Sequence, residues 1–368
     1  MRIMTIFGTR PEIIRLSLIF KILDDHADHV MVHTGQNYST TLSDVFFKDL
    51  SIRSPDVHLG IEASRFSTQV AAIIERSDDV MERVAPERVL ILGDTNTGLA
   101  AIAAARRGIP VFHLEAGNRC FDDRVPEEIN RRIIDHSSSV LMPYTQRSME
   151  NLVREGIERD RIYVVGNPIN EVIRHFGEPI TASKALEDLG LDDRGYMLAT
   201  LHRAENVDEE GRLARLFDGL HAAVDRFKVP LIVSTHPRTA DRLRRSGIAA
   251  RSPQLRLVDP LGFFDFIKLE QRAWCVLTDS GTVQEECSIL GVPNVTVRDV
   301  TERPETIEVG SNVLAGSHPD ALVDAIRIAT GLGPTWQPPA EYMVPSPSTA
   351  IAKILLGHLS LRRHSSTC

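Results

Sequence analysis

Short apolar runs alternate with longer amphipathic stretches along nearly the whole chain. The runs are rich in Val, Ile and Leu and the stretches have helical periodicity, which is typical of parallel sheets covered by helices on both faces. In the first half this pattern predicts strands at residues 3–7, 29–33, 89–92, 111–114, 140–142 and 162–165. In the second half it predicts strands at residues 196–200, 231–234, 255–258, 274–277, 294–297 and 312–314. We therefore expect an α/β protein with two doubly wound, Rossmann-like domains.

The border between the domains is predicted at the segment GNPIN, which interrupts the pattern after a strand. We expect an N-terminal domain over residues 1–168 and a C-terminal domain over residues 169–346. Residues 333–348 are rich in Pro, Gly and Ser, which is typical of a linker, and residues 349–361 have the periodicity of an amphipathic helix. We expect this helix to pack back on the first domain.

Polar and ionisable side chains follow most of the predicted strands. Ligands of open parallel sheets bind outside the carboxyl ends of the strands, so these positions are candidates for a functional site. They are Arg10, His33, Asp94, Glu115, His202, His236, Asp279, Ser280, Arg298 and Asp299. Two such domains facing each other across a cleft would gather these groups there, where closing excludes water.

The segment TDSGTVQEECSIL, residues 278–290, has the features of a phosphate site. Ser280, Gly281 and Thr282 are small, so backbone N–H groups and two hydroxyls can approach an anion at the positive end of the following helix. Thr282 and Glu285 also form a capping-box pattern, and an ordinary helix cap is the alternative interpretation. Carboxylates directly after the loop suit ribose hydroxyls, which favours a nucleoside diphosphate site.

Four positions in the first half are further candidates. Arg10, in the loop GTRPE, is placed to pair with a diphosphate, although the loop lacks the GxGxxG pattern of NAD-binding domains. Arg15 lies on the following helix, where a solvated face is the alternative. Asp94 follows the strand VLIL and is either a reactive carboxylate or a helix N-cap. Glu115 ends the next strand, and the alternative to a reactive carboxylate is a salt bridge to Arg119.

The segment RVPEEINRRIIDH predicts a helix that begins at Pro126. Glu127 and Arg131 are four residues apart, so they can face each other on this helix. Close after Glu115 in the chain, they add a second carboxylate and a cation to the candidate site. An ordinary capped helix is the alternative.

In the second half, His202 with Arg203 and His236 follow two strands. A histidine at a strand end can donate to a phosphate or transfer a proton near neutral pH. Histidines and carboxylates show no recognised metal-ligand spacing, so we predict no metal. Phe264, in LGFFDF, either stacks on a base or fills the core.

Composition narrows the class of protein. Hydrophobic residues make up 42% and charged residues 25% of the 368 residues, as in soluble globular proteins, and no apolar run reaches membrane-spanning length. A net charge of -8 argues against nonspecific nucleic-acid binding. The four cysteines have neither paired nor metal-ligand spacing, which indicates a reducing compartment. We expect a cytoplasmic protein without a membrane partner.

The motifs FGTRPE, LGDTNT, HLEAGNR, VPEEINR, LTDSGTVQEE and VRDVTERPE together resemble those of the non-hydrolysing UDP-N-acetylglucosamine 2-epimerase family, in the same order and spacing. The resemblance implies a GT-B type fold of two Rossmann-like domains, with UDP bound by the C-terminal one, and a homodimer. It also implies inversion at C2 of a UDP-sugar without metal or cofactor. UDP leaves by anti elimination, 2-acetamidoglucal stays bound, and UDP then adds back.

The resemblance also implies roles for single residues. The family's catalytic groups fall on Asp94, Glu115, Glu127, Arg131 and His202. The positions implied for UDP are Arg10, Arg15, His202, His236, Phe264, Ser280, Gly281, Thr282, Glu286 and Arg298, with Glu286 on the ribose. Some family members are activated by a second UDP-sugar, and Gln36, His202 and Arg203 lie where it would bind.

The sequence departs from the family pattern at Arg15, where Lys is frequent, and at Thr282, where a second Gly is frequent. The segments TRPEIIRLS, HTGQNY, EAGNRCFDDRVPEE and GFFDF are similar to a branch that forms UDP-N-acetyl-L-fucosamine from its L-talose epimer. We expect UDP-N-acetylglucosamine and UDP-N-acetylmannosamine as the substrate pair, and the 6-deoxy-L-sugar is the nearest rival substrate. A hydrolysing epimerase, a glycosyltransferase and a non-catalytic UDP-sugar sensor are three competing hypotheses.

Overall fold

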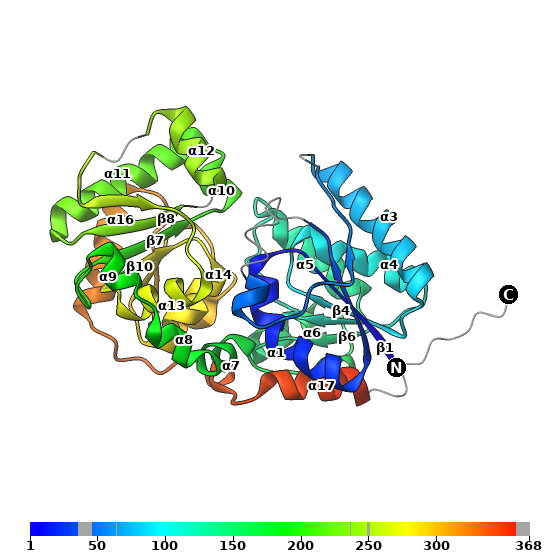
Figure 1. The fold of residues 1–368 in the computed structure, drawn as a ribbon. Coiled ribbons are helices and arrows are strands. Elements are labelled where there is room, and N and C mark those ends of the chain that lie inside the picture. Colours follow the sequence, from blue (N-terminus) through cyan, green and yellow to red (C-terminus); the bar gives the residue numbers. More distant parts are fainter. Residues whose placement is uncertain (36–45, 64, 236, 249–250, 358–368) are drawn as a thin grey trace. The chain divides into compact units, whose positions relative to one another are not determined.

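The computed structural model describes residues 1–35, 46–63, 65–235, 237–248 and 251–357, and it divides the chain into two compact units. One unit comprises Met1–Val172 and the chain from Val344 onward, and the other comprises Ile173–Met343. The helix α7 (Pro168–His175) runs across the first of these borders. Figure 1 shows a sheet flanked by helices in each unit.

The N-terminal unit contains a parallel sheet in the order β3-β2-β1-β4-β5-β6. Its strands are β1 (Arg2–Phe7), β2 (Asp28–His33), β3 (Val57–His58), β4 (Arg88–Leu92), β5 (Val111–Leu114) and β6 (Val140–Met142). The helices are α1 (Arg10–His26), α3 (Phe66–Val84), η1 (Asn96–Ala100), α4 (Ala101–Arg106), α5 (Pro126–Ser137), α6 (Gln146–Arg154), η2 (Arg159–Arg161) and α17 (Pro347–Gly357). This strand order is that of a Rossmann fold.

The C-terminal unit repeats this topology, with the sheet order β12-β11-β10-β7-β8-β9. Its strands are β7 (Met197–Leu201), β8 (Leu231–Thr235), β9 (Leu255–Val258), β10 (Cys275–Thr278), β11 (Asn294–Thr296) and β12 (Asn312–Leu314). The helices are α8 (Gly177–Ala182), α9 (Ala185–Leu189), α10 (Ala204–Val207), α11 (Glu210–Phe227), α12 (Pro237–Ser246), α13 (Phe263–Arg272), α14 (Gly281–Leu290), α15 (Pro304–Glu308), α16 (Pro319–Gly331) and η3 (Ala340–Met343). The predicted pair of Rossmann-like sheets is confirmed.

The predicted strand at residues 162–165 is wrong. Ile162 forms only an isolated bridge to Leu141. The chain still runs beside β6, because Tyr163 and Val165 donate backbone hydrogen bonds to the carbonyls of Leu141 and Pro143. Pro143 has no N–H group to donate in return, so the ladder ends there. The sequence pattern also missed β3, because two residues are too short to form a periodic signal.

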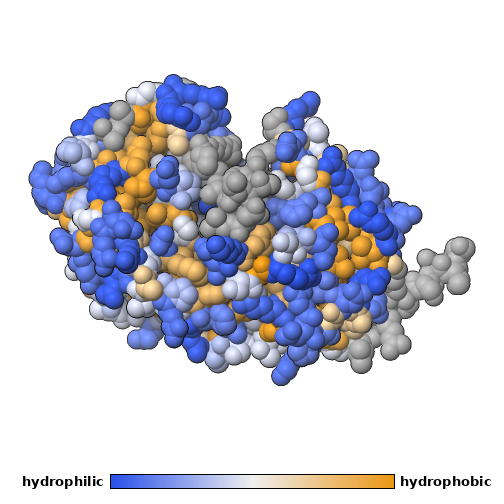
Figure 2. Space-filling view, viewed as in Figure 1, coloured by the Kyte–Doolittle hydropathy of each residue, from blue (hydrophilic) through white to orange (hydrophobic). Residues whose placement is uncertain are grey.

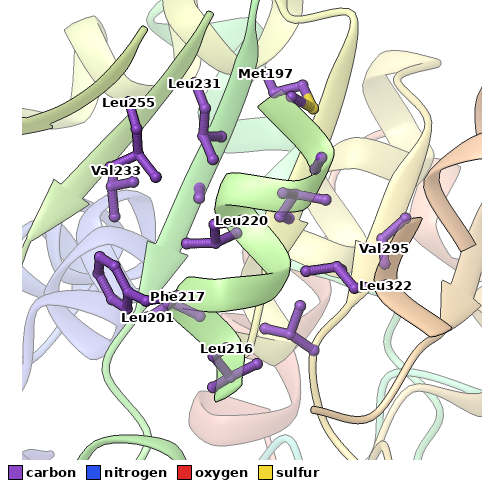
Figure 3. Packing of buried hydrophobic residues seen from close by; sticks show 14 of the residues in the cluster. Met197, Leu201, Leu216, Phe217, Leu220, Leu231, Val233, Leu255, Val295 and Leu322 are labelled. Carbon is purple, nitrogen blue, oxygen red and sulfur yellow. The ribbon is translucent and has the colours of Figure 1, made fainter. Parts of the chain in front are cut away.

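The cores of both units consist of apolar strand faces covered by amphipathic helices. In the C-terminal unit, Leu216, Phe217 and Leu220 of α11 pack on residues of the sheet such as Met197 and Leu231 (Figure 3). The outer sides of α3 and α12 are mainly hydrophilic (Figure 2). Spacings of three and four residues give a helix such an apolar inner side and a polar outer side. None of the helices in the described ranges has both the length and the apolar character to cross a membrane.

The last described helix, α17, packs against α1 in the N-terminal unit. The backbone N–H of Ser348 donates to the Glu171 carboxylate at 2.9 Å, and the Arg88 guanidinium donates to the carbonyl of Leu355. Residues 358–361 of the helix predicted at 349–361 lie outside the described residues.

Candidate active site

Two carboxylates follow neighbouring strands in the N-terminal unit. Leu92 and Leu114 are paired at the ends of β4 and β5, and Gly93 donates a backbone hydrogen bond to the carbonyl of Leu114 at 3.0 Å. Asp94 and Glu115 follow directly, so both start from the carboxyl edge of the sheet. The predicted placement of these two residues at adjacent strand ends is therefore confirmed.

Asp94 is held by an arginine of α5. The Arg131 guanidinium contacts one Asp94 oxygen through Nε at 2.8 Å and through Nη2 at 2.7 Å. The helix after Asp94 has Thr95 as its N-cap, so the N-cap interpretation of Asp94 is wrong. A guanidinium that contacts a carboxylate through two nitrogens fixes the orientation of that carboxylate.

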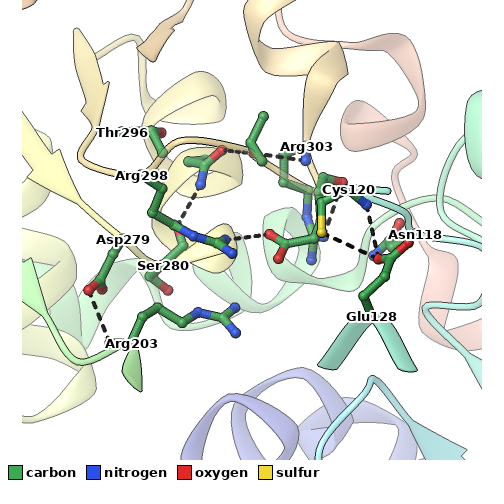
Figure 4. A network of polar contacts seen from close by, with 12 residues as sticks. Asn118, Cys120, Glu128, Arg203, Asp279, Ser280, Thr296, Arg298 and Arg303 are labelled. Atoms are coloured by element: carbon green, nitrogen blue, oxygen red, sulfur yellow. Dashed lines mark hydrogen bonds and ion pairs between the residues drawn. The ribbon is translucent and has the colours of Figure 1, made fainter. Parts of the chain in front are cut away.

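A third carboxylate, Glu128, holds Arg131 from the other side. It is fully buried and accepts a bond from Arg131 Nη1 at 2.6 Å and bonds from the backbone N–H groups of Cys120 and Phe121 at 3.0 and 3.1 Å (Figure 4 shows Glu128 and Cys120). Burial alone would raise the pKa of Glu128, but the Cys120 N–H and Arg131 outweigh it and lower this pKa. Sequence reasoning missed Glu128 because it singled out Glu127, its half-buried neighbour in the first turn of α5.

Glu115 is paired with Arg15 and has an unusual backbone. Its φ angle is 69°, in the left-handed region that costs a residue with a side chain about 1–2 kcal/mol. The Arg15 guanidinium donates to one Glu115 oxygen and lies 5.6 Å from the centre of the Tyr144 ring. Asn118 Nδ2 donates to the other oxygen at 3.2 Å. Strained backbone of this kind is concentrated at functional sites.

This pairing corrects two sequence interpretations. Arg15 is 2% exposed, so the solvated helix face is wrong. The salt bridge between Glu115 and Arg119 is also wrong, because Arg119 bonds to Asp135 at 2.8 Å and to Glu155 at 2.6 Å. Arg15 and Glu115 are 100 residues apart in the chain, and only the tertiary fold brings them together.

A buried polar network underlies both carboxylates. His113 Nδ1 lies 2.8 Å from Asp135, and His113 Nε2 lies 2.8 Å from the carbonyl oxygen of Gly93, the residue before Asp94. Asp135 also accepts the backbone N–H of Gly117 at 3.2 Å, two residues after Glu115. Burial alone would raise the pKa of Asp135, but His113 and Arg119 outweigh it and lower this pKa. The network therefore ties together the loops that contain Asp94 and Glu115.

Gly117 is the tightest point of this network. Its φ is 79°, and a Cβ atom added there would lie 2.2 Å from the carbonyl oxygen of Ser148. We expect Gly117→Ala to lower the free energy of unfolding by roughly 3 kcal/mol or more, since it combines left-handed strain with a backbone clash. The control is Gly156→Ala, with φ 88° and open space around the Cβ, which should cost only the strain, about 1–2 kcal/mol. Equal denaturation midpoints for the two variants would contradict this packing.

In the C-terminal unit, Asp279 orients His202. Asp279 is fully buried at the end of β10 and accepts the backbone N–H groups of His202 and Arg203 at 3.0 Å, and Asn206 Nδ2 at 3.1 Å. It also lies 3.0 Å from Nδ1 of the His202 ring, which is 40% exposed. Burial alone would raise the pKa of Asp279, but His202 and these hydrogen bonds hold it down at about 2. The histidine is thus presented at the strand ends with one nitrogen fixed by a carboxylate.

The start of α14 has the geometry of an anion site. Ser280 is the non-helical N-cap and Gly281 the first helical residue, so the capping box predicted for Thr282 and Glu285 is wrong. Glu285 is buried and bonds instead to Arg303. The half-buried Ser280 has no side-chain cap bond. A ten-residue helix begins here, and its first N–H groups carry positive potential.

The remaining predicted UDP positions differ in surroundings. Arg298 is 1% exposed and bonds to Glu205 at 3.0 Å and Glu302 at 2.7 Å, and its Nη2 has no hydrogen-bond partner among the described residues (Figure 4).

Arg10 begins α1 and lies 5.7 Å from the ring of Phe46. Phe264 is half-buried, with its ring 5.5 Å from that of Phe176 and 5.8 Å from that of Phe263. Gln36 and His236 lie outside the described residues.

Glu12 was also missed, although the sequence contains its signal. It forms a capping box with Thr9, the pattern T-x-x-E, and accepts the Gly8 N–H at 2.6 Å and the Thr95 hydroxyl at 2.7 Å. Burial raises the pKa of Glu12 to about 7. The residue thereby joins the loop between β1 and α1, directly before Arg10, to the loop after β4. Among the described residues, no three His, Cys, Asp or Glu side chains form a group that could hold a metal ion.

The two Rossmann-like sheets define an α/β protein of the GT-B type. The family model described as UDP-N-acetylglucosamine 2-epimerase matches residues 21–356. The chain belongs to the UDP-N-acetylglucosamine 2-epimerase family, and the resemblance seen in the sequence motifs is confirmed.

Individual relatives agree with this assignment. The UDP-N-acetylglucosamine 2-epimerase of Methanocaldococcus jannaschii is 39% identical over 92% of this chain and 95% of its own. The UDP-2,3-diacetamido-2,3-dideoxy-D-glucuronate 2-epimerase of Pseudomonas aeruginosa is 38% identical over 92% and 94%. A crystal structure of the M. jannaschii enzyme in complex with UDP-GlcNAc and UDP matches with a TM-score of 0.92 and 37% identity, over 96% of this chain and 99% of that chain.

Proposed function

We propose that the protein is a UDP-N-acetylglucosamine 2-epimerase, an isomerase that interconverts UDP-N-acetylglucosamine and UDP-N-acetylmannosamine. Family membership supports the class of reaction. The observation that carries the chemistry is the pair of carboxylates, Asp94 and Glu115, at adjacent strand ends, each fixed by a buried arginine.

The reaction needs a base and an acid on opposite faces of C2. A base removes the C2 proton, the electron pair forms a C1–C2 double bond, and the C1–O bond breaks as UDP takes its electrons. In the return step UDP adds to C1, and an acid delivers a proton to the other face of C2. The C2 proton is weakly acidic, so both groups must be held close to the sugar and partly shielded from water.

In this proposal Asp94, Glu115 and Glu127 supply these carboxyl groups, and Arg131 orients Asp94. Because Arg15 contacts Glu115, we assign it to the Glu115 carboxylate rather than to UDP.

The remaining roles concern UDP. We assign the diphosphate to the start of α14, at Ser280, Gly281 and Thr282, with His202 as a donor to the departing charge. Glu286 is assigned to the ribose. The further UDP positions are Arg10, His236, Phe264 and Arg298. Some family members also bind an activating UDP-sugar, and for this we keep Gln36, His202 and Arg203.

The Gly281→Ala variant tests the phosphate assignment. An added Cβ would come no closer than 3.4 Å to Arg303, an ordinary contact, so we expect the variant to fold normally. It should nevertheless bind UDP roughly ten times more weakly, since a methyl group at the helix start hinders approach to the N–H groups. Calorimetric titration with UDP measures the affinity, and Gly331→Ala, also with space for a Cβ, is the control. Unchanged affinity in Gly281→Ala would contradict the assignment.

We also propose that the protein acts as a homodimer in the cytoplasm. Support for the dimer comes from exposed apolar side chains of the N-terminal unit: Phe66 (60% exposed), Ile129 (47%) and Ile133 (38%). Such side chains on a surface favour association with another protein surface. Support for a reducing compartment comes from Cys120, Cys275 and Cys287, which form no disulfide bond. Light scattering of the purified protein tests the dimer.

Product analysis tests the proposed substrate pair. With UDP-N-acetylglucosamine the protein should form UDP-N-acetylmannosamine and no free sugar. Release of free N-acetylmannosamine with UDP would instead indicate a hydrolysing epimerase. No reaction with this sugar, together with turnover of the 6-deoxy-L-talose derivative, would move the assignment to the branch that forms UDP-N-acetyl-L-fucosamine.

A further inference from the structure

A second buried acid lies behind Glu286, the residue assigned above to the ribose. Glu270 is on α13 and is fully buried, and its carboxyl group is within hydrogen-bonding range of the Glu286 carboxyl on the neighbouring helix α14. One Glu270 oxygen accepts the thiol of Cys287 at 3.2 Å. The other oxygen meets no N–H or O–H donor among the described residues.

The surroundings of Glu270 disfavour the charged form of its carboxyl group. No Lys or Arg of the described residues forms an ion pair with it, and the titratable groups that face it are Glu286 and Cys287, with the Cys275 thiol next to Cys287. Burial, followed by the negative charge of Glu286, raises the pKa of Glu270 well above its usual value. Two carboxyl groups in such contact share one proton, and the more buried group keeps it.

We propose that Glu270 is a positioning residue that donates its carboxyl proton to Glu286 in a hydrogen bond and so fixes this carboxylate to accept the ribose hydroxyls. The proposal rests on the assignment of Glu286 to the ribose. Glu270 itself is held in place, since the Tyr196 hydroxyl donates to the carbonyl of Leu269, the residue before it, at 2.5 Å. A neutral carboxyl donor behind a carboxylate leaves the outer oxygen of that carboxylate for the ligand.

Two substitutions separate this role from simple packing. Glu270→Gln retains an N–H donor of the same length, and Glu270→Leu fills the space without any donor. Because the native group is a neutral buried acid, both variants should fold, and thermal melting checks this. Cys287→Ala is the packing control, since it removes the other bond to Glu270 but leaves the pair with Glu286.

The measurement is the dissociation constant of each variant for UDP and for 2′,3′-dideoxy-UDP. We expect Glu270→Leu to bind UDP roughly ten times more weakly, with unchanged affinity for the dideoxy analogue, and Glu270→Gln and Cys287→Ala to match the native protein with both ligands. Equal loss for both nucleotides would reveal a packing effect and overturn the proposal.

The Glu286→Ala variant shows whether a negative result concerns the role of Glu270 or the assignment of Glu286 to the ribose. If Glu286→Ala loses discrimination between the two nucleotides but Glu270→Leu keeps it, only the role of Glu270 is wrong. If Glu286→Ala still discriminates as the native protein does, the ribose assignment is wrong and the proposal is overturned with it.

Discussion

The Glu115→Gln variant is expected to lose roughly a thousandfold or more of its turnover of UDP-N-acetylglucosamine and to retain its affinity for UDP. The amide cannot accept or deliver the C2 proton, whereas no UDP contact is assigned to Glu115. Arg15 is 2% exposed and loses a charged partner in this variant, so the melting temperature should also fall. Turnover is therefore measured per folded protein, with UDP affinity determined by calorimetry.

Glu115→Asp is the matched variant for this test. It keeps the charge opposite Arg15 but withdraws the carboxylate by one methylene group, so stability should recover while turnover stays roughly a hundredfold low. Glu82→Gln, at an exposed carboxylate of α3, is the control for charge removal and should be fully active. Near-native turnover of folded Glu115→Gln would remove Glu115 from the catalytic groups.

The Asp94→Asn variant is expected to lose roughly a hundredfold or more of its turnover, again with UDP affinity retained. The amide keeps an oxygen toward Arg131 but has no charge and no acid–base function at neutral pH. Arg131 still has Glu128 at 2.6 Å, so the fold should be little affected. Initial rates at saturating substrate measure the loss.

The control for this variant is Asp123→Asn. Asp123 lies on the same segment of the chain as Glu128 and is 68% exposed beside Arg132, so its amide should change neither rate nor stability. If Asp94→Asn and Asp123→Asn had equal activity, Asp94 would be a structural partner of Arg131 and not a catalytic group.

Most of the fold could be predicted from the sequence because strands of a parallel sheet are buried on both faces. The strand β4 is buried along its whole length, and after Arg88 it appears in the sequence as the unbroken apolar run VLIL. The prediction failed where this signal is absent or misleading. The two residues of β3 are not fully buried, and the apolar segment after Arg161 lies beside Pro143, which cannot extend the ladder.

The candidate site was predictable in position but not in its pairings. Ligand groups of a parallel sheet follow the strand ends, and this rule located Asp94, Glu115 and His202. It cannot tell which distant cation meets which carboxylate, so a salt bridge between Glu115 and Arg119 and a solvated Arg15 stayed open as alternatives. The sequence did not single out Glu270 for another reason. On a short helix with charged neighbours, a fully buried acid and a solvated acid have the same sequence pattern.

Proton NMR of the protein with UDP-N-acetylglucosamine in D2O tests the central claim most directly. Removal of the C2 proton and its return from solvent on the other face should place deuterium at C2 as the anomeric signal of UDP-N-acetylmannosamine grows. Epimerisation without deuterium at C2 would contradict the elimination mechanism. Binding of UDP without exchange, with this substrate or with the 6-deoxy-L-sugar, would contradict an epimerase altogether and leave a UDP-sugar sensor.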